Sequence, residues 1–98
     1  MAKTLSEEEE YKITVSLSRK GIQTLDMLKE TSGFGSRGRT IEEAIISVYE
    51  LTEMGKPLFL QVGTEMQKQG AMSQMTQASV AGWFIMVMAK LTRFMSAK

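Results

Sequence analysis

The first half of the chain begins with an alternation of polar and apolar residues and continues with helical periodicity. Between Tyr11 and Ser18, Ile13, Val15 and Leu17 occupy every second position and polar residues stand between them. Successive side chains of a β-strand point to opposite faces, so the three apolar residues would share one face. The alternation predicts a strand that buries one face and leaves the other free.

A first amphipathic helix is predicted directly after this strand. Ser18 is a suitable N-cap residue, and Ile22, Leu25 and Leu28 recur at helical spacing up to Lys29. The stretch 31–39 contains three glycines and two serines, which is typical of a turn, and Gly33 is well placed to stop the helix.

A second helix is predicted from Thr40 to about Met54. Thr40 and Glu43 have the spacing of a capping box. Gly55 and Pro57 are expected to end the helix. Its apolar face is formed by Ile41, Ala44, Ile45, Val48, Tyr49 and Leu51 or Thr52.

The second half of the chain is rich in methionine and glutamine, and two further helices are predicted on either side of Gly70. In the last one, Trp83 falls outside the main apolar stripe. The uninterrupted apolar run 80–89 has ten residues, against the ~20 needed to span a bilayer, so it is too short for a transmembrane helix. The basic residues of this half are too sparse for a membrane-binding face, so no membrane partner is expected. The stripe is Val80, Phe84, Val87, Leu91 and Phe94, and with Trp83 these residues are the predicted C-terminal packing or partner face.

Size and composition favour an oligomer and argue against catalysis. A chain of 98 residues with one strand and a few helices buries little apolar surface as a monomer. It has no cysteine and no histidine, which removes the commonest general base and the commonest metal ligands. We therefore expect no enzymatic activity, no metal site and no cofactor.

The charge is nearly balanced overall but unevenly distributed. The net charge is +1, with −2 in residues 1–57 and +3 in residues 58–98. Residues 1–10 end in four glutamates, Glu7 to Glu10, and are predicted to be a disordered arm. The start of the chain lacks the apolar segment of a signal peptide, so a cytoplasmic location is expected.

Residues 12–49 resemble the ribbon-helix-helix family of repressors, the MetJ/Arc type. The similarity rests on the pattern Lys-Ile-Thr-Val-Ser-Leu-Ser, the helix after it, the glycine-containing turn, and a second helix beginning Arg-Thr-Ile-Glu-Glu-Ala-Ile at Arg39. The resemblance implies a mainly α fold. In this ribbon-helix-helix dimer, one N-terminal strand per subunit pairs across the dimer, two helices follow, and a C-terminal extension adds one or two more.

The resemblance also implies which residues contact DNA. Lys12, Thr14 and Ser16 stand where the family places its base-reading side chains in the major groove. The start of the second helix would bind phosphate through Ser36, Arg37, Arg39 and Thr40, although the stretch 33–40 is longer than the family's usual turn. The implied dimer core comprises Ile13, Val15, Leu17, Ile22, Leu25, Leu28, Ile41, Ala44, Ile45 and Val48.

The sequence thus predicts three parts: an acidic arm at 1–10, a DNA-binding domain at 11–54 and a helical extension at 58–98. The expected function is a homodimeric, sequence-specific binder of double-stranded DNA that regulates transcription. The extension would support higher oligomers on DNA or bind a protein partner. An antitoxin or a plasmid partition or copy-control protein with the same DNA-binding half is one alternative, and a helical scaffold without a nucleic-acid role is another.

Overall fold

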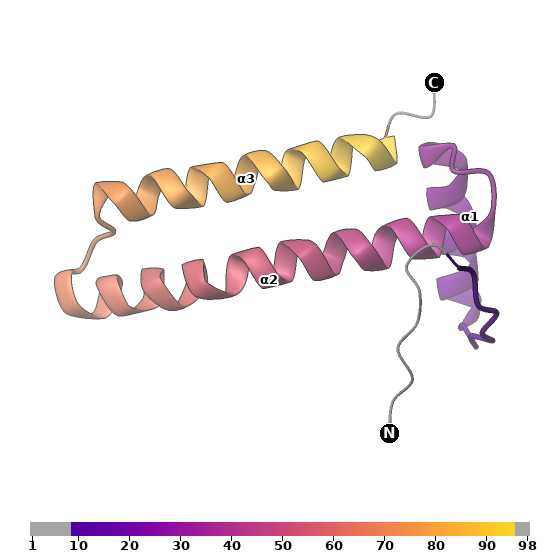
Figure 1. Ribbon diagram of the computed structural model, residues 1–98, viewed down its shortest axis with the longest axis horizontal. Coiled ribbons are helices and arrows are strands. Elements are labelled where there is room, and N and C mark those ends of the chain that lie inside the picture. The colour runs from indigo at the N-terminus through magenta and orange to yellow at the C-terminus, as the bar shows by residue number, and fades with distance from the viewer. Residues whose placement is uncertain (1–8, 96–98) are drawn as a thin grey trace.

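The computed structural model describes residues 9–95, which form three helices. They are α1 (Arg19–Ser32), α2 (Arg37–Gln69) and α3 (Gln74–Met95). Helices α2 and α3 lie side by side and antiparallel, and α1 crosses the end of this hairpin where α2 begins and α3 ends (Figure 1). The prediction of a mainly helical protein is confirmed.

The predicted N-terminal strand, and with it the ribbon-helix-helix fold, is wrong for this structure. Residues 10–18 form neither helix nor strand, and no strand is present between residues 9 and 95. A strand needs a neighbouring strand to pair with its backbone groups. Residues 9–17 make no backbone hydrogen bond with the rest of the described chain, so the alternation of side chains does not become a ribbon.

The ends of α1 confirm the sequence prediction. The Ser18 hydroxyl accepts a hydrogen bond from the Gly21 backbone N–H at 3.0 Å, as an N-cap does. Gly33 adopts the left-handed conformation at φ 74°, and its N–H donates to the Lys29 carbonyl. That conformation favours glycine, which explains why the helix stops there.

Helix α2 begins earlier than predicted. Its N-cap is Ser36, whose hydroxyl accepts from the Arg39 N–H, and Arg37 is the first helical residue. Thr40, the predicted start, is fully buried, and its hydroxyl donates to the Ser36 carbonyl at 2.7 Å. The capping box with Glu43 is therefore absent, and the side chain of Glu43 forms ion pairs instead.

Helix α2 also continues past the predicted end at Met54, through Gly55 and Pro57, to Gln69. A proline inside a helix removes one backbone donor and crowds the carbonyl four residues earlier, a cost of about 3 kcal/mol. Packing of the following turns against α3 offsets this cost. The predicted break at Gly70 is confirmed, because Gly70 caps α2 in the left-handed conformation at φ 73°.

The hairpin is held by one face of each helix. On α2 the least exposed positions follow a spacing of three and four residues: Thr40, Ala44, Ser47, Leu51, Gly55, Leu58, Val62 and Glu65. On α3 they are Thr76, Val80, Trp83, Val87, Lys90 and Phe94. These two inner faces contact each other, yet among residues 9–95 no apolar side chain is fully buried.

Candidate nucleic-acid interface

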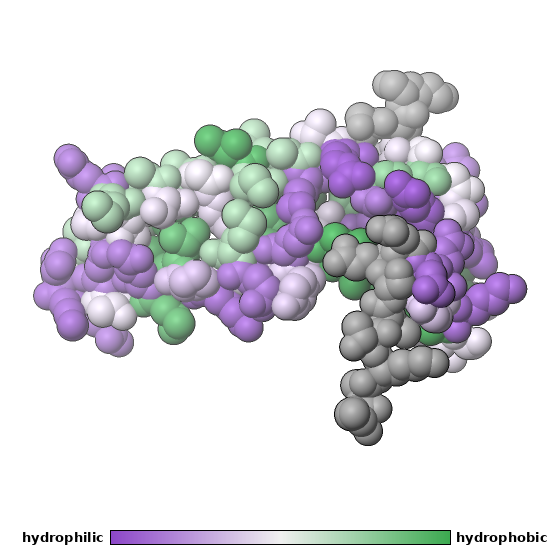
Figure 2. Space-filling view, viewed as in Figure 1, coloured by the Kyte–Doolittle hydropathy of each residue, from purple (hydrophilic) through white to green (hydrophobic). Residues whose placement is uncertain are grey.

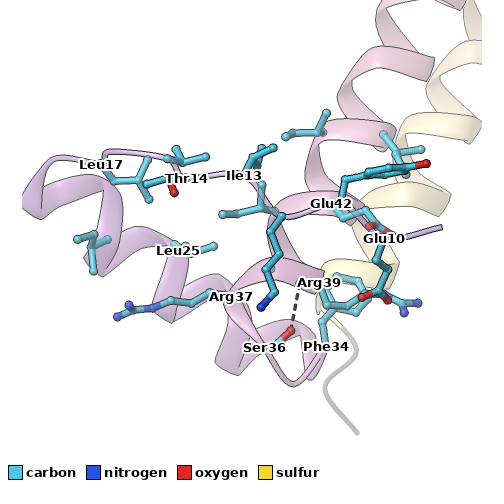
Figure 3. A pocket seen from close by; sticks show the side chains of 18 of the residues that line it. Glu10, Ile13, Thr14, Leu17, Leu25, Phe34, Ser36, Arg37, Arg39 and Glu42 are labelled. Atoms are coloured by element: carbon cyan, nitrogen blue, oxygen red, sulfur yellow. Dashed lines mark hydrogen bonds between the residues drawn. The ribbon is translucent and has the colours of Figure 1, made fainter. Parts of the chain in front are cut away.

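The extended segment, residues 9–18, crosses over a groove at the α1 end of the molecule. The groove has a volume of about 1150 Å³ and is lined by this segment, α1 and the start of α2. Figure 3 shows Ile13, Leu17 and Leu25 around it. The predicted base-reading residues Lys12, Thr14 and Ser16 are all exposed on this segment. Their role in reading bases stays a prediction.

Seven residues of the predicted dimer core line the same groove: Ile13, Val15, Leu17, Ile22, Leu25, Ile41 and Ile45. In a single chain Ile13 is 80% exposed, and Val15, Leu17, Ile22, Ile45 and Val48 are also exposed. Leu25, Leu28, Ile41 and Ala44 are half-buried. A second apolar hollow, about 460 Å³, lies along α2 and is lined by Ala44, Ile45, Val48, Tyr49 and Thr52. These apolar residues lie at the α1 end of the molecule and along α2, and a single chain leaves most of them exposed to solvent.

The predicted phosphate site at the start of α2 is occupied by internal contacts. The Arg37 guanidinium donates two hydrogen bonds of 2.8 Å to the carboxylate of Asp26 on α1. The bond and charge of Arg37 lower the pKa of Asp26, and Asp26 in turn raises the pKa of Arg37. The Ser36 hydroxyl caps the helix and the Thr40 hydroxyl is buried. Arg37 therefore joins α1 to α2.

Arg39 is also paired within the chain. Its Nε lies 3.2 Å from the Glu43 carboxylate. The same carboxylate forms a second ion pair, at 2.8 Å, with Arg93 on α3. The Glu43 side chain is 14% exposed. Together with the edge-on contact of Phe34 and Phe94, at 5.3 Å between ring centroids, this shared carboxylate ties the α1–α2 turn to the end of α3.

Two basic residues that the sequence analysis passed over stand at the start of α1. Arg19 and Lys20 are the first two helical residues, both are exposed, and neither forms an ion pair with any residue between 9 and 95. The N-terminal end of a helix carries partial positive charge, so two cations there oppose the helix dipole. Consecutive basic residues directly after an N-cap serine are the signal that would have identified them.

Positive charge is concentrated in this part of the molecule. Residues 11–40 contain six basic side chains and only two acidic ones, Asp26 and Glu30. Because Arg37 and Arg39 are paired, the exposed cations without a partner among the described residues are Lys12, Arg19 and Lys20. The predicted acidic arm falls outside the described residues except for Glu9 and Glu10, which are exposed.

The predicted C-terminal face divides into two. Val80, Trp83, Val87 and Phe94 face α2, whereas Phe84 and Leu91 are exposed. The placement of Trp83 outside the packed stripe is therefore wrong. Its indole N–H donates to the Leu51 carbonyl at 3.0 Å, and its ring occupies the space beside Gly55, where a Cβ would lie 3.1 Å from it.

The turn between α2 and α3 is closed by one carboxylate. Glu65 accepts hydrogen bonds from the Ser73 backbone N–H at 2.7 Å and from the Thr76 hydroxyl at 2.6 Å, with weaker contacts from the Ser73 hydroxyl and Gln61. These donors lower the pKa of Glu65, the Thr76 hydroxyl most of all. This network stabilises the end of the hairpin opposite to α1.

By length and composition alone, α3 is long and apolar enough to cross a membrane. No cluster of three or more metal-binding side chains occurs within residues 9–95. Comparisons of the chain with known protein families, with curated proteins and with solved structures found no match.

Proposed function

We propose that the protein is a homodimeric, sequence-specific DNA-binding protein that regulates transcription. The observation that carries the proposal is the pair Arg19 and Lys20, two exposed cations at the positive end of α1 with no partner among the described residues. Phosphate is the anion that such an arrangement favours, through both the side-chain charges and the helix dipole.

The two helix starts provide an internal comparison in support of this assignment. Both begin with basic residues and have no acidic residue in the first turn. At α2 the basic residues are neutralised by Asp26 and Glu43, so their charge serves the fold. At α1 no described residue does so, and an external anion fills that role.

The extended segment supplies the groups that distinguish bases. Lys12, Thr14 and Ser16 are exposed, and they lie within a few residues of Arg19 and Lys20. A lysine donates to guanine O6 and N7, and hydroxyls donate or accept at base edges. In this proposal, α1 positions the protein on the phosphate backbone, and each subunit's extended segment contacts the bases.

The test is fluorescence anisotropy of the purified protein with the DNA upstream of its own gene and with an unrelated duplex, across a salt series. Specific binding predicts an excess of ~10³ or more for one duplex and weakening of both with salt. In a dimer the double substitution Arg19→Ala/Lys20→Ala removes four phosphate contacts, so the salt slope should fall by about 3–4 for both duplexes.

Two further variants separate base contacts from general charge. Lys12→Ala should cost about 1–3 kcal/mol per contact on the preferred duplex and much less on the unrelated one. Lys68→Ala is the matched control, since Lys68 is exposed and lies near the opposite end of the hairpin, far from α1 (Figure 1). The proposal would be refuted if Arg19→Ala/Lys20→Ala and Lys68→Ala lost the same DNA affinity. It would also be refuted if no duplex were bound in a random-sequence selection.

A further inference from the structure

A second apolar stripe runs along α3 beside the face that packs on α2. It consists of Ala81, Phe84, Met88, Leu91 and Met95, again at spacings of three and four residues. Phe84 is 56% exposed, Met88 65%, Leu91 52% and Met95 66%. A stripe with this spacing is typical of a helix that packs against another helix.

This stripe shares one side of the hairpin with exposed apolar residues of α2. Ile45, Val48, Thr52 and Phe59 each directly follow an inner-face residue of α2, and every member of the α3 stripe directly follows an inner-face residue of α3. One residue turns a helix by about 100°, and because the helices are antiparallel, this step points both sets to the same side.

The aromatic residues join the two sets into one surface. Trp83 makes edge-on contacts with Phe59 on α2 and with Phe84 on α3, at centroid distances of 5.4 and 5.7 Å. The face of the hairpin that Figure 2 shows is the opposite one, and along it polar side chains are interspersed with apolar ones. We call the combined residues of α2 and α3 the apolar side of the hairpin.

The total surface of one copy is larger than that of a compact monomer of the same mass. The chain exposes 8258 Å², whereas a compact monomer of 10.9 kDa exposes about 5,600 Å². The excess of about 2,700 Å², which includes the ends of the chain and the segment before α1, is more than three times the ~800 Å² that each partner contributes to a standard interface. An area of this size fits an obligate dimer.

We propose that a second copy of the chain packs on the apolar side of the hairpin, with the two α3 helices antiparallel and crossing at Met88. A symmetric pairing about Met88 places Phe84 opposite Leu91 of the other copy and the small Ala81 opposite the long Met95. The inference identifies the surface through which copies associate, and it does not depend on DNA binding.

Charge determines the antiparallel direction. The basic residues of α3, Lys90 and Arg93, lie in its last two turns, and the rest of the helix carries no charged side chain. A parallel pair would bring these cations together across the interface, which is unfavourable. In the antiparallel pair they lie beside the uncharged stretch 83–86 of the other copy, and their partners Glu50 and Glu43 remain in place.

The chain has no cysteine, so single cysteines report directly on this interface. Oxidation of Met88→Cys in the full-length protein should convert most of it to a disulfide dimer, because two residues at the crossing point approach closely enough for a disulfide. A mixture of Phe84→Cys and Leu91→Cys should give the mixed dimer, identified by intact mass, in preference to Phe84→Cys with itself. Met75→Cys is the control, as Met75 is 78% exposed on the other side of the same helix.

A second experiment uses charge instead of cross-linking. Met88→Glu should convert the dimer to a monomer by sedimentation equilibrium, with at least a hundredfold weaker self-association, whereas Met75→Glu should keep the wild-type mass. The proposal is overturned by efficient 84–84 cross-linking, by equal cross-linking at positions 75 and 88, by an unchanged mass for Met88→Glu, or by a monomeric wild type that binds phosphatidylcholine vesicles instead.

Discussion

The hairpin of α2 and α3 and the N-terminal region, residues 9–36, treat charged and polar groups in opposite ways. In the hairpin, every glutamate except Glu42 has a partner: Glu43, Glu50, Glu53 and Glu65. In the N-terminal region, Lys12, Arg19 and Lys20 have none among the described residues, and Asp26 alone is tied to the hairpin through Arg37. The hairpin uses most of its charged groups to hold its own geometry, whereas these three cations of the N-terminal region are exposed and, under the proposed function, bind an external anion.

The largest expected effect tests the hairpin side of this comparison at Trp83. Trp83→Ala removes the hydrogen bond to Leu51 and both aromatic contacts, so we expect a loss of about 2–4 kcal/mol in the free energy of unfolding. Trp83→Phe should lose less, about 1 kcal/mol, through the missing N–H. Urea denaturation at one fixed protein concentration measures both. Equal stability of wild type and Trp83→Ala would show that the hairpin does not depend on this contact.

An intermediate effect is expected where the two regions meet, at the pair of Asp26 and Arg37. Asp26→Asn leaves the Arg37 guanidinium without its carboxylate partner and so adds one free cation per subunit to the basic region. The salt slope of DNA binding should become steeper by up to about 2 per dimer, while the thermal midpoint falls slightly. Glu30→Gln on the same helix removes the same charge without touching Arg37, and it is the control. An identical slope for both variants would contradict the distinct role of the pair.

The smallest expected effect is the pH dependence of the hairpin turn. The pKa of Glu65 is lowered in the folded protein, so its ionised form contributes stability above the ordinary glutamate pKa of about 4.3 and this contribution is lost as the pH falls through the lowered value. Glu65→Gln should therefore be less stable than wild type at pH 7, and the difference should shrink as the pH falls below the ordinary glutamate pKa. Thermal unfolding across this range measures it, and a difference that does not change with pH would contradict the role of the charge.

Local signals predicted the helix ends correctly where one residue determines the conformation. Ser18, Gly33 and Gly70 act through capping or through a left-handed backbone, and both depend only on neighbours in sequence. Pro57 was misleading because contacts with α3, which begins at Gln74 and lies outside the local sequence, outweigh its local cost. The extended residues 11–18 show the same limit, since the alternation indicates an extended conformation but says nothing of a pairing partner within the chain.

The sequence predicted the candidate sites only in part, because ion pairs and packed faces depend on contacts between helices as well as on local sequence. The sequence placed the basic residues near the turn but could not show that Asp26 and Glu43 neutralise Arg37 and Arg39, because these pairs depend on how the helices cross. On α3 the predicted stripe combined Val80, Val87 and Phe94 of the inner face with two exposed residues, Phe84 and Leu91. The true inner face includes Lys90, whose stem lies against α2 while its ammonium group reaches Glu50.

The absence of a fully buried apolar side chain among residues 9–95 has a consequence for how the protein behaves at different concentrations. When copies complete each other's apolar surface, folding and association are one equilibrium, and each tenfold dilution costs about 1.4 kcal/mol per dimer. The amount of folded protein then rises faster than the amount of chain produced. The folded dimer of such a protein accumulates only above a threshold concentration of the chain, and no ligand is needed to set this threshold.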